Sequence, residues 1–285
     1  HRADMGKMLR RLLGEDVELI SRSEPGLPRI HADPAPVEQV IINLAVNSRD
    51  AMPRGGTIVS EATRVHLDTD YAATHPDVAP GEHVCLSFSD TGSGMTRAVR
   101  ERLFEPFFTT KEQHTGSGLG LAAVYGIVRQ SGGHVQVYSE PEVGTTFRVY
   151  FPAAAAEQDG QGTVVGAAAV PRGAETILLA EDDDSVRCIM VECLRDLGYR
   201  VLETRDGREA LAAAAQAGPI DLLLTDVIMP GMSGRQLHRE LAATRPGLRV
   251  LYVSGYTDEA IVQHGILEPG TALLQKPFSP AMLGD

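Results

Sequence analysis

The 285-residue sequence predicts an α/β protein of two domains joined by a linker. In the N-terminal half, an amphipathic helix pattern is followed by neighbouring pairs of strands, which favours a two-layer α+β sandwich. In the C-terminal half, short apolar strands alternate strictly with amphipathic helices, which favours a doubly wound, five-stranded parallel sheet. Residues 153–174 are rich in alanine and glycine and predict a flexible linker. We therefore place the domains at residues 1–152 and 175–285.

The elements of the first domain follow from the spacing of its apolar residues. Residues 34–52 form a helix whose core-facing stripe has six members: Val37, Val40, Ile41, Leu44, Ser48 and Ala51. Residues 57–67 and 83–90 alternate as half-buried strands do. Residues 119–133 are a helix closed by a glycine pair, and residues 134–140 and 145–152 are a last pair of strands.

The elements of the second domain repeat a strand-helix unit. Strands are expected at 176–180, 200–204, 221–226, 249–255 and 272–277, and helices at 184–198, 206–218 and 233–246. In a doubly wound sheet of this kind, ligands bind beyond the carboxyl ends of the strands.

Composition limits the class of protein. Hydrophobic residues make up 43% and charged residues 22%, as in globular domains, and the net charge of −12 argues against non-specific nucleic-acid binding. The three cysteines form no CxxC pair, which favours reduced thiols. No apolar run approaches the ~18 residues of a membrane helix. We expect a cytoplasmic chain without nucleic-acid partners or a membrane segment, which can come from a longer, membrane-associated sensor.

A polar face runs along the first predicted helix. Asn43, Asn47 and Asp50 lie at i, i+4 and i+7, apart from the core-facing stripe. A polar face of this kind is either solvated or paired with a ligand, because buried amides and carboxylates need partners. The helix alone does not decide between these interpretations.

Three later motifs favour a ligand. SDTGSGM (residues 89–95) ends a strand in an aspartate followed by glycines, and GTTF (144–147) forms a late turn. TGSGLGL (115–121) opens a helix with three glycines, where backbone N–H groups can approach a phosphate. The occurrence of all these motifs in order within about a hundred residues predicts a nucleotide site.

These motifs resemble the ATP-binding catalytic domain of sensor histidine kinases, in the Bergerat-type superfamily with gyrase, Hsp90 and MutL. NLAVNSRDAM, DTGSGM, LFEPFFTTK and GSGLGL match its N, G1, F and G2 boxes across nearly all of residues 1–152. The resemblance implies ATP and Mg²⁺ as cofactors. The residues it implies for their binding are Asn43, Asn47, Asp50, Asp90, Gly92, Gly94, Lys111, Gly116, Gly118, Leu119 and Gly120.

The resemblance also implies roles. Asn47 binds Mg²⁺ with Asn43 nearby, and Asp90 accepts a hydrogen bond from the adenine amino group. Gly92 and Gly94 give the base and ribose room, and the three glycines of the G2 box cradle the phosphates. Lys111 either reaches the γ-phosphate or is an ordinary surface lysine.

One position distinguishes kinases from hydrolases within this superfamily. Relatives that hydrolyse ATP carry a glutamate general base four residues before the Mg²⁺-binding asparagine, where this sequence has Asn43. An amide cannot accept the proton of the attacking water. The sequence therefore favours transfer of the γ-phosphoryl group to another nucleophile.

Acidic residues and a lysine follow the predicted strands of the second domain. Glu181, Asp182 and Asp183 follow the first strand, Asp226 and Ser254 end the third and fourth, and Lys276 ends the fifth. All fall at the strand ends where a doubly wound sheet forms its crevice. Acids that converge there need a cation or a lysine to offset their repulsion.

LLLTDVIMPGMSG and LLQKPF resemble the flavodoxin-like response-regulator receiver domain, over residues 175–285. The resemblance implies that Asp226 accepts the phosphoryl group. Glu181, Asp182, Asp226 and the carbonyl of Ile228 are the implied Mg²⁺ ligands. Ser254 and Lys276 are implied to contact the phosphoryl oxygens.

The second domain departs from the receiver pattern in two places. Leu273 stands where the family often has an aromatic switch residue, so that role is expected to be muted or moved to Tyr256. The last helix is expected to be truncated, because the sequence ends shortly after Pro280. The Lys276–Pro277 bond is a candidate cis peptide.

Together the two resemblances identify a fragment of a hybrid sensor histidine kinase. Its function is then that of a protein-histidine kinase fused to a phosphoaspartate receiver, without its own histidine hairpin. The expected partners are that hairpin, from an upstream part or in trans, and a downstream phosphotransfer or response-regulator protein. An ATP-sensing relay module is the alternative, and a repair-type or chaperone-type ATPase is disfavoured by Asn43 and the receiver.

Overall fold

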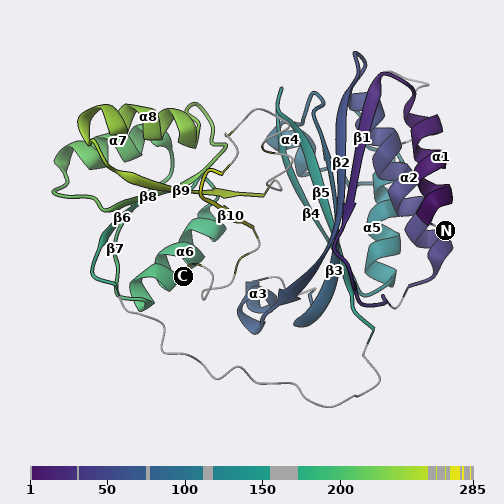
Figure 1. Cartoon of the computed structure of the whole chain (residues 1–285), viewed down its shortest axis with the longest axis horizontal. Coiled ribbons are helices and arrows are strands. Elements are labelled where there is room, and N and C mark those ends of the chain that lie inside the picture. The colour runs from purple at the N-terminus through teal and green to yellow at the C-terminus, as the bar shows by residue number, and fades with distance from the viewer. Residues whose placement is uncertain are drawn as a thin grey trace. The chain divides into compact units, whose positions relative to one another are not determined.

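The computed structural model divides the chain into two compact units, residues 1–160 and 161–285 (Figure 1). The described residues are 2–30, 32–74, 78–111, 118–154, 173–255, 261, 267, 270–276, 278 and 283. Gly116, Tyr256, Pro277 and most of the predicted linker lie outside them. The domain boundaries at residues 152 and 175 therefore stay predictions.

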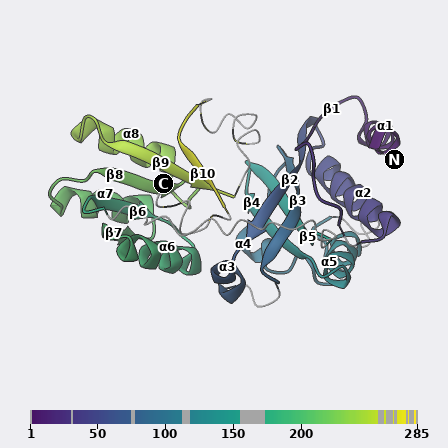
Figure 2. The ribbon, with the colours of Figure 1, turned by 60° about the horizontal axis from the view of Figure 1, so that its bottom comes forward.

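The first unit is a mixed sheet covered by helices on one face. Its helices are α1 (Arg2–Leu13), α2 (Pro34–Ala51), α3 (Thr69–Thr74), α4 (Arg97–Arg100) and α5 (Gly120–Gln130). Its strands are β1 (Val17–Ser23), β2 (Gly56–Leu67), β3 (Gly81–Asp90), β4 (His134–Glu140) and β5 (Gly144–Pro152). The described strands form a five-stranded sheet in the order β1-β2-β3-β5-β4, parallel only between β1 and β2. Helices α1, α2 and α5 lie along one face (Figure 2), which confirms the predicted α+β sandwich.

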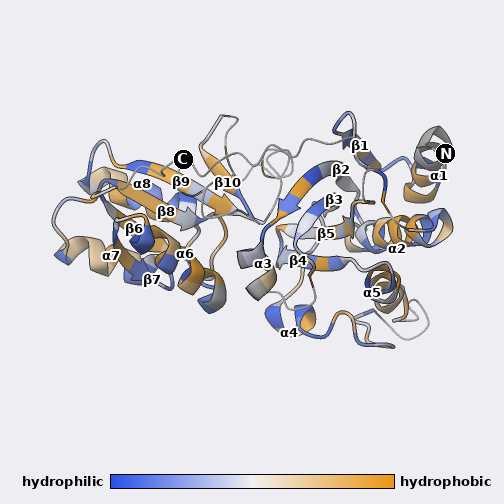
Figure 3. Cartoon of the chain, turned by 90° about the horizontal axis from the view of Figure 1, so that it is seen from below, coloured by the Kyte–Doolittle hydropathy of each residue, from blue (hydrophilic) through white to orange (hydrophobic). Residues whose placement is uncertain are grey.

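The core of this unit follows from the stripe on α2. Val40, Leu44 and Ala45 of α2 are fully buried and pack in one cluster with Phe88 of β3 and Val124 of α5. Hydrophobic and hydrophilic residues are interspersed along α2 in Figure 3, as expected of a helix with one face on a sheet. Burial of this stripe leaves the polar face of α2 directed away from the sheet.

Four described elements of the first unit lie where the sequence predicts no helix or strand: α1, β1, α3 and α4. Residues 1–33 were assigned no structure, yet they contain α1 and β1, and β1 pairs in parallel with β2. The burial of β1 along its length lacks the regular alternation of a half-buried strand. A periodicity argument therefore had no signal to detect, because β1 is defined by its partner rather than by its own pattern.

The second unit is the predicted doubly wound sheet. Its strands are β6 (Thr176–Ala180), β7 (Arg200–Thr204), β8 (Leu222–Asp226), β9 (Arg249–Ser254) and β10 (Leu273–Gln275). Its helices are α6 (Asp184–Asp196), α7 (Gly207–Gln216) and α8 (Gly234–Thr244). The described strands run parallel in the order β10-β9-β8-β6-β7. Helices α7 and α8 cover one face and α6 the other (Figure 1), each over its own apolar cluster.

The strand order places the site of the second unit. Strand β6 is flanked by β7 on one side and β8 on the other, so the direction of winding reverses beside β6. In open parallel sheets, ligands bind at this reversal, beyond the carboxyl ends of the strands. The residues that follow β6 and β8 are therefore the first candidates for chemistry.

Candidate functional site

Asp90 ends β3 as a buried carboxylate, only 2% exposed. Its Oδ2 accepts a hydrogen bond from the Ser48 hydroxyl of α2 at 2.8 Å. Its Oδ1 accepts from the backbone N–H of Gly92 at 3.0 Å and of Thr145 at 3.2 Å. One carboxylate thus connects the N-box helix, the G1 turn and the start of β5.

The electrostatics of Asp90 suit a hydrogen-bonded ligand. Burial raises the pKa of this carboxyl to about 6, although the hydrogen bonds from Ser48, Gly92 and Thr145 act to lower it. Among the described residues, its hydrogen-bond partners are neutral donors rather than lysines or arginines. The charge is therefore under-compensated, and a ligand that donates a hydrogen bond there would be favoured.

The two G1 glycines are needed for packing against the protein itself. A Cβ on Gly92 would lie 2.7 Å from the Ala51 Cβ and 2.8 Å from the Asp90 Oδ1. Gly94 has a φ of 63°, and a Cβ there would collide with the Glu140 carbonyl oxygen. The predicted role in making room for a base and ribose stays a prediction, because protein contacts alone require both glycines.

The polar face of α2 contacts Lys111, at the end of the F box, and Gly120, in the G2 box. Asn43 Nδ2 donates to the Gly120 carbonyl oxygen at 3.1 Å, and Asn43 Oδ1 accepts from Gln39 at 3.0 Å. A Cβ on Gly120 would lie 3.7 Å from Asn47 Nδ2. Asp50 accepts a hydrogen bond from Lys111 at 2.7 Å. The structure therefore brings the predicted N-box, F-box and G2-box residues together.

The described part of the G2 box, from Gly118 on, leads into the first turn of α5. Gly118 has a φ of 64°, and its carbonyl accepts a hydrogen bond from the Phe107 N–H at 3.0 Å. The N-cap residue Leu119 makes no side-chain capping hydrogen bond, so it does not occupy the N–H groups of the first turn. An anion is suited to this helix start. Gly116 lies outside the described residues.

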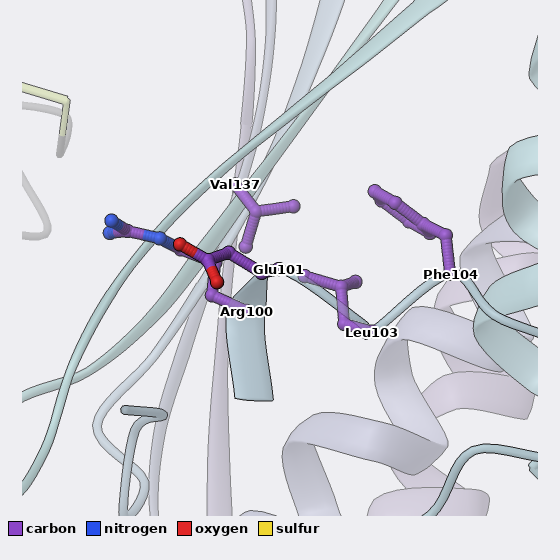
Figure 4. Close-up of a pocket in the computed structure, with 5 residues that line it drawn as sticks. All are labelled: Arg100, Glu101, Leu103, Phe104 and Val137. Carbon is purple, nitrogen blue, oxygen red and sulfur yellow. The ribbon is translucent and has the colours of Figure 1, made fainter. Parts of the chain in front are cut away.

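A pocket of about 240 Å³ lies beside β4, between it and the segment that contains α4 (Figure 4). It is lined by Arg100, Glu101, Leu103, Phe104 and Val137. None of these is a predicted binding residue, and the lining is mostly apolar. The predicted nucleotide residues lie elsewhere in the unit.

The second unit gathers carboxylates at the ends of β6 and β8. One carboxylate oxygen from each of Glu181, Asp182 and Asp226 lies within 4.8 Å of the others. Lys276, which follows β10, donates to Glu181 Oε2 and to Asp226 Oδ2, at 2.7 Å in each case. Glu181 is 1% exposed and Lys276 is 7% exposed, so their charges are screened little by water.

The charges in this cluster do not balance. Burial, followed by repulsion from Asp226, raises the pKa of Glu181 to about 8. Burial alone would lower the pKa of Lys276, but Asp226 and Glu181 outweigh it and raise that pKa. Burial and Asp226 also raise the pKa of Asp182. Ionising all three carboxyl groups beside one ammonium group would leave excess negative charge, and a hard divalent cation fits both that charge and the oxygen ligands.

Ile228 contacts Asp226, and Ser254 follows the partner of Asp226 in the neighbouring strand. The N–H of Ile228 donates to Asp226 Oδ1 at 3.0 Å. Ser254 ends β9 one residue after Val253, the register partner of Asp226, and it is 1% exposed. Leu273, which replaces an expected aromatic residue, begins β10 and pairs with Tyr252 of β9.

Three residues of these sites were not singled out from the sequence. Ser48 had been placed on the core-facing stripe, and Thr145 contributes only its backbone. Arg187 of α6 donates from Nη1 to the Glu181 carbonyl oxygen at 2.9 Å and pairs with Asp184 through Nη2. For Ser48 a signal was present, because a hydroxyl within an apolar stripe needs a partner.

Comparison with known families assigns a class to each unit. Residues 32–155 match the family described as "Histidine kinase-, DNA gyrase B-, and HSP90-like ATPase". Residues 177–285 match the response regulator receiver domain. The chain is therefore a histidine-kinase-type ATPase domain followed by a receiver domain, and both are domains of two-component signalling proteins.

Similar proteins narrow the class to hybrid sensor kinases. The chain is 39% identical over 285 residues to the Sensor kinase CckA of Brucella abortus (strain 2308), covering 97% of this chain and 30% of that protein. It is 30% identical over 226 residues to the Sensor protein EvgS of Escherichia coli (strain K12), covering 78% of this chain and 18% of that protein. The chain is homologous to these sensor proteins and spans less than a third of the length of either.

One solved structure is also similar in sequence. A crystal structure of the receiver domain from the hybrid histidine kinase CckA is 40% identical, with a TM-score of 0.32, and covers 38% of this chain and 91% of that one.

Over the described residues, none of the helices combines the length and apolar character needed to span a membrane.

We predict that Gly94→Ala destabilises the first unit without nucleotide, by about 1–3 kcal/mol, because the new Cβ meets the Glu140 carbonyl at a positive φ. Urea unfolding followed by circular dichroism measures the change. Gly126→Ala is the matched control: Gly126 lies inside α5 with no atom within 4 Å of its Cβ position, so this change should stabilise by up to about 1 kcal/mol. Equal effects of the two substitutions would contradict the packing argument.

We predict a pH-dependent difference in stability between wild type and Asp90→Asn. The pKa of Asp90 is about 6 in the fold against 3.8 unfolded, so the folded state holds the extra proton between these values. Wild type should lose about 3 kcal/mol relative to the variant as the pH rises from 3.8 through about 6, and little beyond. Unfolding free energies of both proteins across this range test the sign. If the unfolding free energies of the two proteins change in parallel with pH, the pKa of Asp90 is not raised in the fold.

Proposed function

We propose that the chain is the catalytic and receiver part of a hybrid histidine kinase, and that its first unit transfers the γ-phosphoryl group of ATP to a histidine. The residue that favours a kinase over a hydrolase is Asn43. Its amide donates to the Gly120 carbonyl and accepts from Gln39, so both ends are engaged in the protein. An amide in this position cannot remove a proton from water. The acceptor must then be a nucleophile supplied by another segment.

The nucleotide site uses the groups gathered around the polar face of α2. Asp90 accepts a hydrogen bond from the adenine amino group, which offsets its under-compensated charge. The N–H groups of Gly118, Leu119 and Gly120 bind the phosphates together with Gly116, and Lys111 pairs with the terminal phosphate. Asn47, with Asn43 nearby, would supply its amide oxygen to Mg²⁺, and the ion would offset phosphate charge when bound.

The phosphotransfer steps follow from these groups. The histidine of a hairpin attacks the γ-phosphorus, the N–P bond forms, and ADP leaves with the bridging oxygen. The carboxylate of Asp226 then attacks that phosphorus, which forms an acyl phosphate and returns a neutral histidine. Ser254 and Lys276 bind the phosphoryl oxygens. Glu181, Asp182, Asp226 and the Ile228 carbonyl hold the Mg²⁺ that offsets their charge.

The proposal requires partners that provide the histidine. A histidine-containing hairpin, from an upstream part of the same protein or in trans, accepts phosphate from ATP, and a downstream phosphotransfer or regulator protein exchanges phosphate with Asp226. The chain acts in the cytoplasm, where ATP and reduced thiols are both present. The alternative, an ATP-sensing relay module without kinase activity, is not favoured by the similarity to sensor kinases.

We predict that the chain, mixed with a separately purified hairpin from a similar hybrid kinase and γ-labelled ATP, yields acid-labile phosphohistidine on the hairpin. Label on the chain should then be base-labile, as expected of an acyl phosphate. Asp226→Asn should abolish the second label and leave the first, because the two sites lie in different units.

Three outcomes separate the possibilities in this experiment. ATP binding without phosphohistidine favours the sensing module. Acid-stable label contradicts the whole scheme. Loss of ATP binding in Asp226→Asn contradicts the assignment of ATP binding to the first unit and phosphoryl acceptance to the second.

A further inference from the structure

Lys111 is paired with a carboxylate of α2. Its Nζ donates to Asp50 Oδ2 at 2.7 Å, and its backbone N–H donates to the Thr109 hydroxyl at 3.1 Å. The Lys111 side chain is 34% exposed and that of Asp50 is 27% exposed, so the pair is partly sheltered from water. A phosphate that takes up this ammonium must therefore displace a carboxylate.

The Asp50 carboxylate is itself held by a second cation. Arg49 donates to Asp50 Oδ1 from Nη2 at 3.0 Å and from Nε at 3.3 Å. A third donor of Arg49, Nη1, bonds to the carbonyl oxygen of Leu12 near the end of α1 at 3.0 Å. The carboxylate that binds Lys111 is thus attached, through Arg49, to a helix that precedes the matched ATPase region.

The charge state of Asp50 supports this pairing. Burial alone would raise its pKa, but the hydrogen bonds from Lys111 and Arg49 outweigh burial and lower the pKa. Asp50 is therefore ionised at neutral pH, with two cationic neighbours. Its placement one helical turn after Asn47 puts this negative charge beside the residues proposed to bind the phosphates.

We propose that Asp50 is a positioning residue that holds Lys111 in an ion pair and competes with the terminal phosphate for its ammonium group, and that Arg49 keeps the carboxylate in place. This rests on the proposed function. Asp50 then acts on nucleotide through Lys111 and does not bind it directly. The competition lowers affinity most for a nucleotide whose terminal phosphate reaches Lys111, so it sets the preference between ATP and ADP.

The magnitude follows from the exposure of the pair. Partly exposed ion pairs contribute modestly, so release of Lys111 should change affinity by about two- to fivefold. The sign is the informative part, because a residue that binds nucleotide or metal directly weakens binding when it is neutralised. A competitor strengthens binding when it is neutralised.

The experiment titrates the whole chain with ADP and with a non-hydrolysable ATP analogue at fixed Mg²⁺, by calorimetry. Asp50→Asn should bind the analogue about two- to fivefold tighter than wild type and gain less for ADP. Lys111→Met should bind the analogue more weakly, and adding Asp50→Asn to it should give no gain. Asp50→Ala is a second variant and should reproduce the tightening. Far-UV circular dichroism verifies that each variant is folded.

Asp33→Asn is the matched control, because Asp33 precedes α2, is exposed, and its side chain caps no helix amide. It makes the same charge change without touching Lys111 and should leave affinity unchanged. Weaker or unchanged binding by Asp50→Asn overturns the proposal, as does equal tightening with and without Lys111. If wild type binds neither nucleotide, the proposed function itself fails, which is a different result.

Discussion

A carboxylate buried at the end of a strand must be offset, and both units are organised around that requirement. Leaving such a charge unpaired in a protein interior is strongly unfavourable. Asp90 is offset by three neutral donors from α2, the G1 turn and β5. Glu181 is offset by Lys276, which also binds Asp226. In each unit, the offsetting groups come from elements distant in sequence, so satisfying the charge also determines how those elements meet.

The two solutions suit different ligands. Neutral donors leave the Asp90 carboxyl with a raised pKa of about 6, so it can gain from a ligand that donates a hydrogen bond. In the receiver domain, one lysine lies beside three carboxyl groups, and the excess negative charge is suited to a divalent cation. The incomplete compensation of these carboxylates is thus what makes them candidate sites rather than structural ion pairs.

Much of the fold could be predicted from the sequence, because strand-helix alternation and the stripe on α2 are local patterns. The receiver elements were located to within a few residues, and the sandwich was recognised without α1 and β1. The position of Asp90 could be predicted from its motif, but its bond to Ser48 could not, since the two are 42 residues apart. The Asp50–Lys111 pair, 61 residues apart, and the contact of Arg187 with a backbone carbonyl likewise depend on tertiary structure.

Excess negative charge around Asp226 makes this residue a phosphoryl acceptor that needs a divalent cation. The direct measurement is mass-spectrometric mapping of the modified residue after the chain is incubated with phosphoramidate, with Mg²⁺ or with a chelator. The account predicts a hydroxylamine-sensitive phosphoryl group on the peptide that contains Asp226, only when Mg²⁺ is present. Modification of another residue, or equal modification in the presence of the chelator, would contradict it.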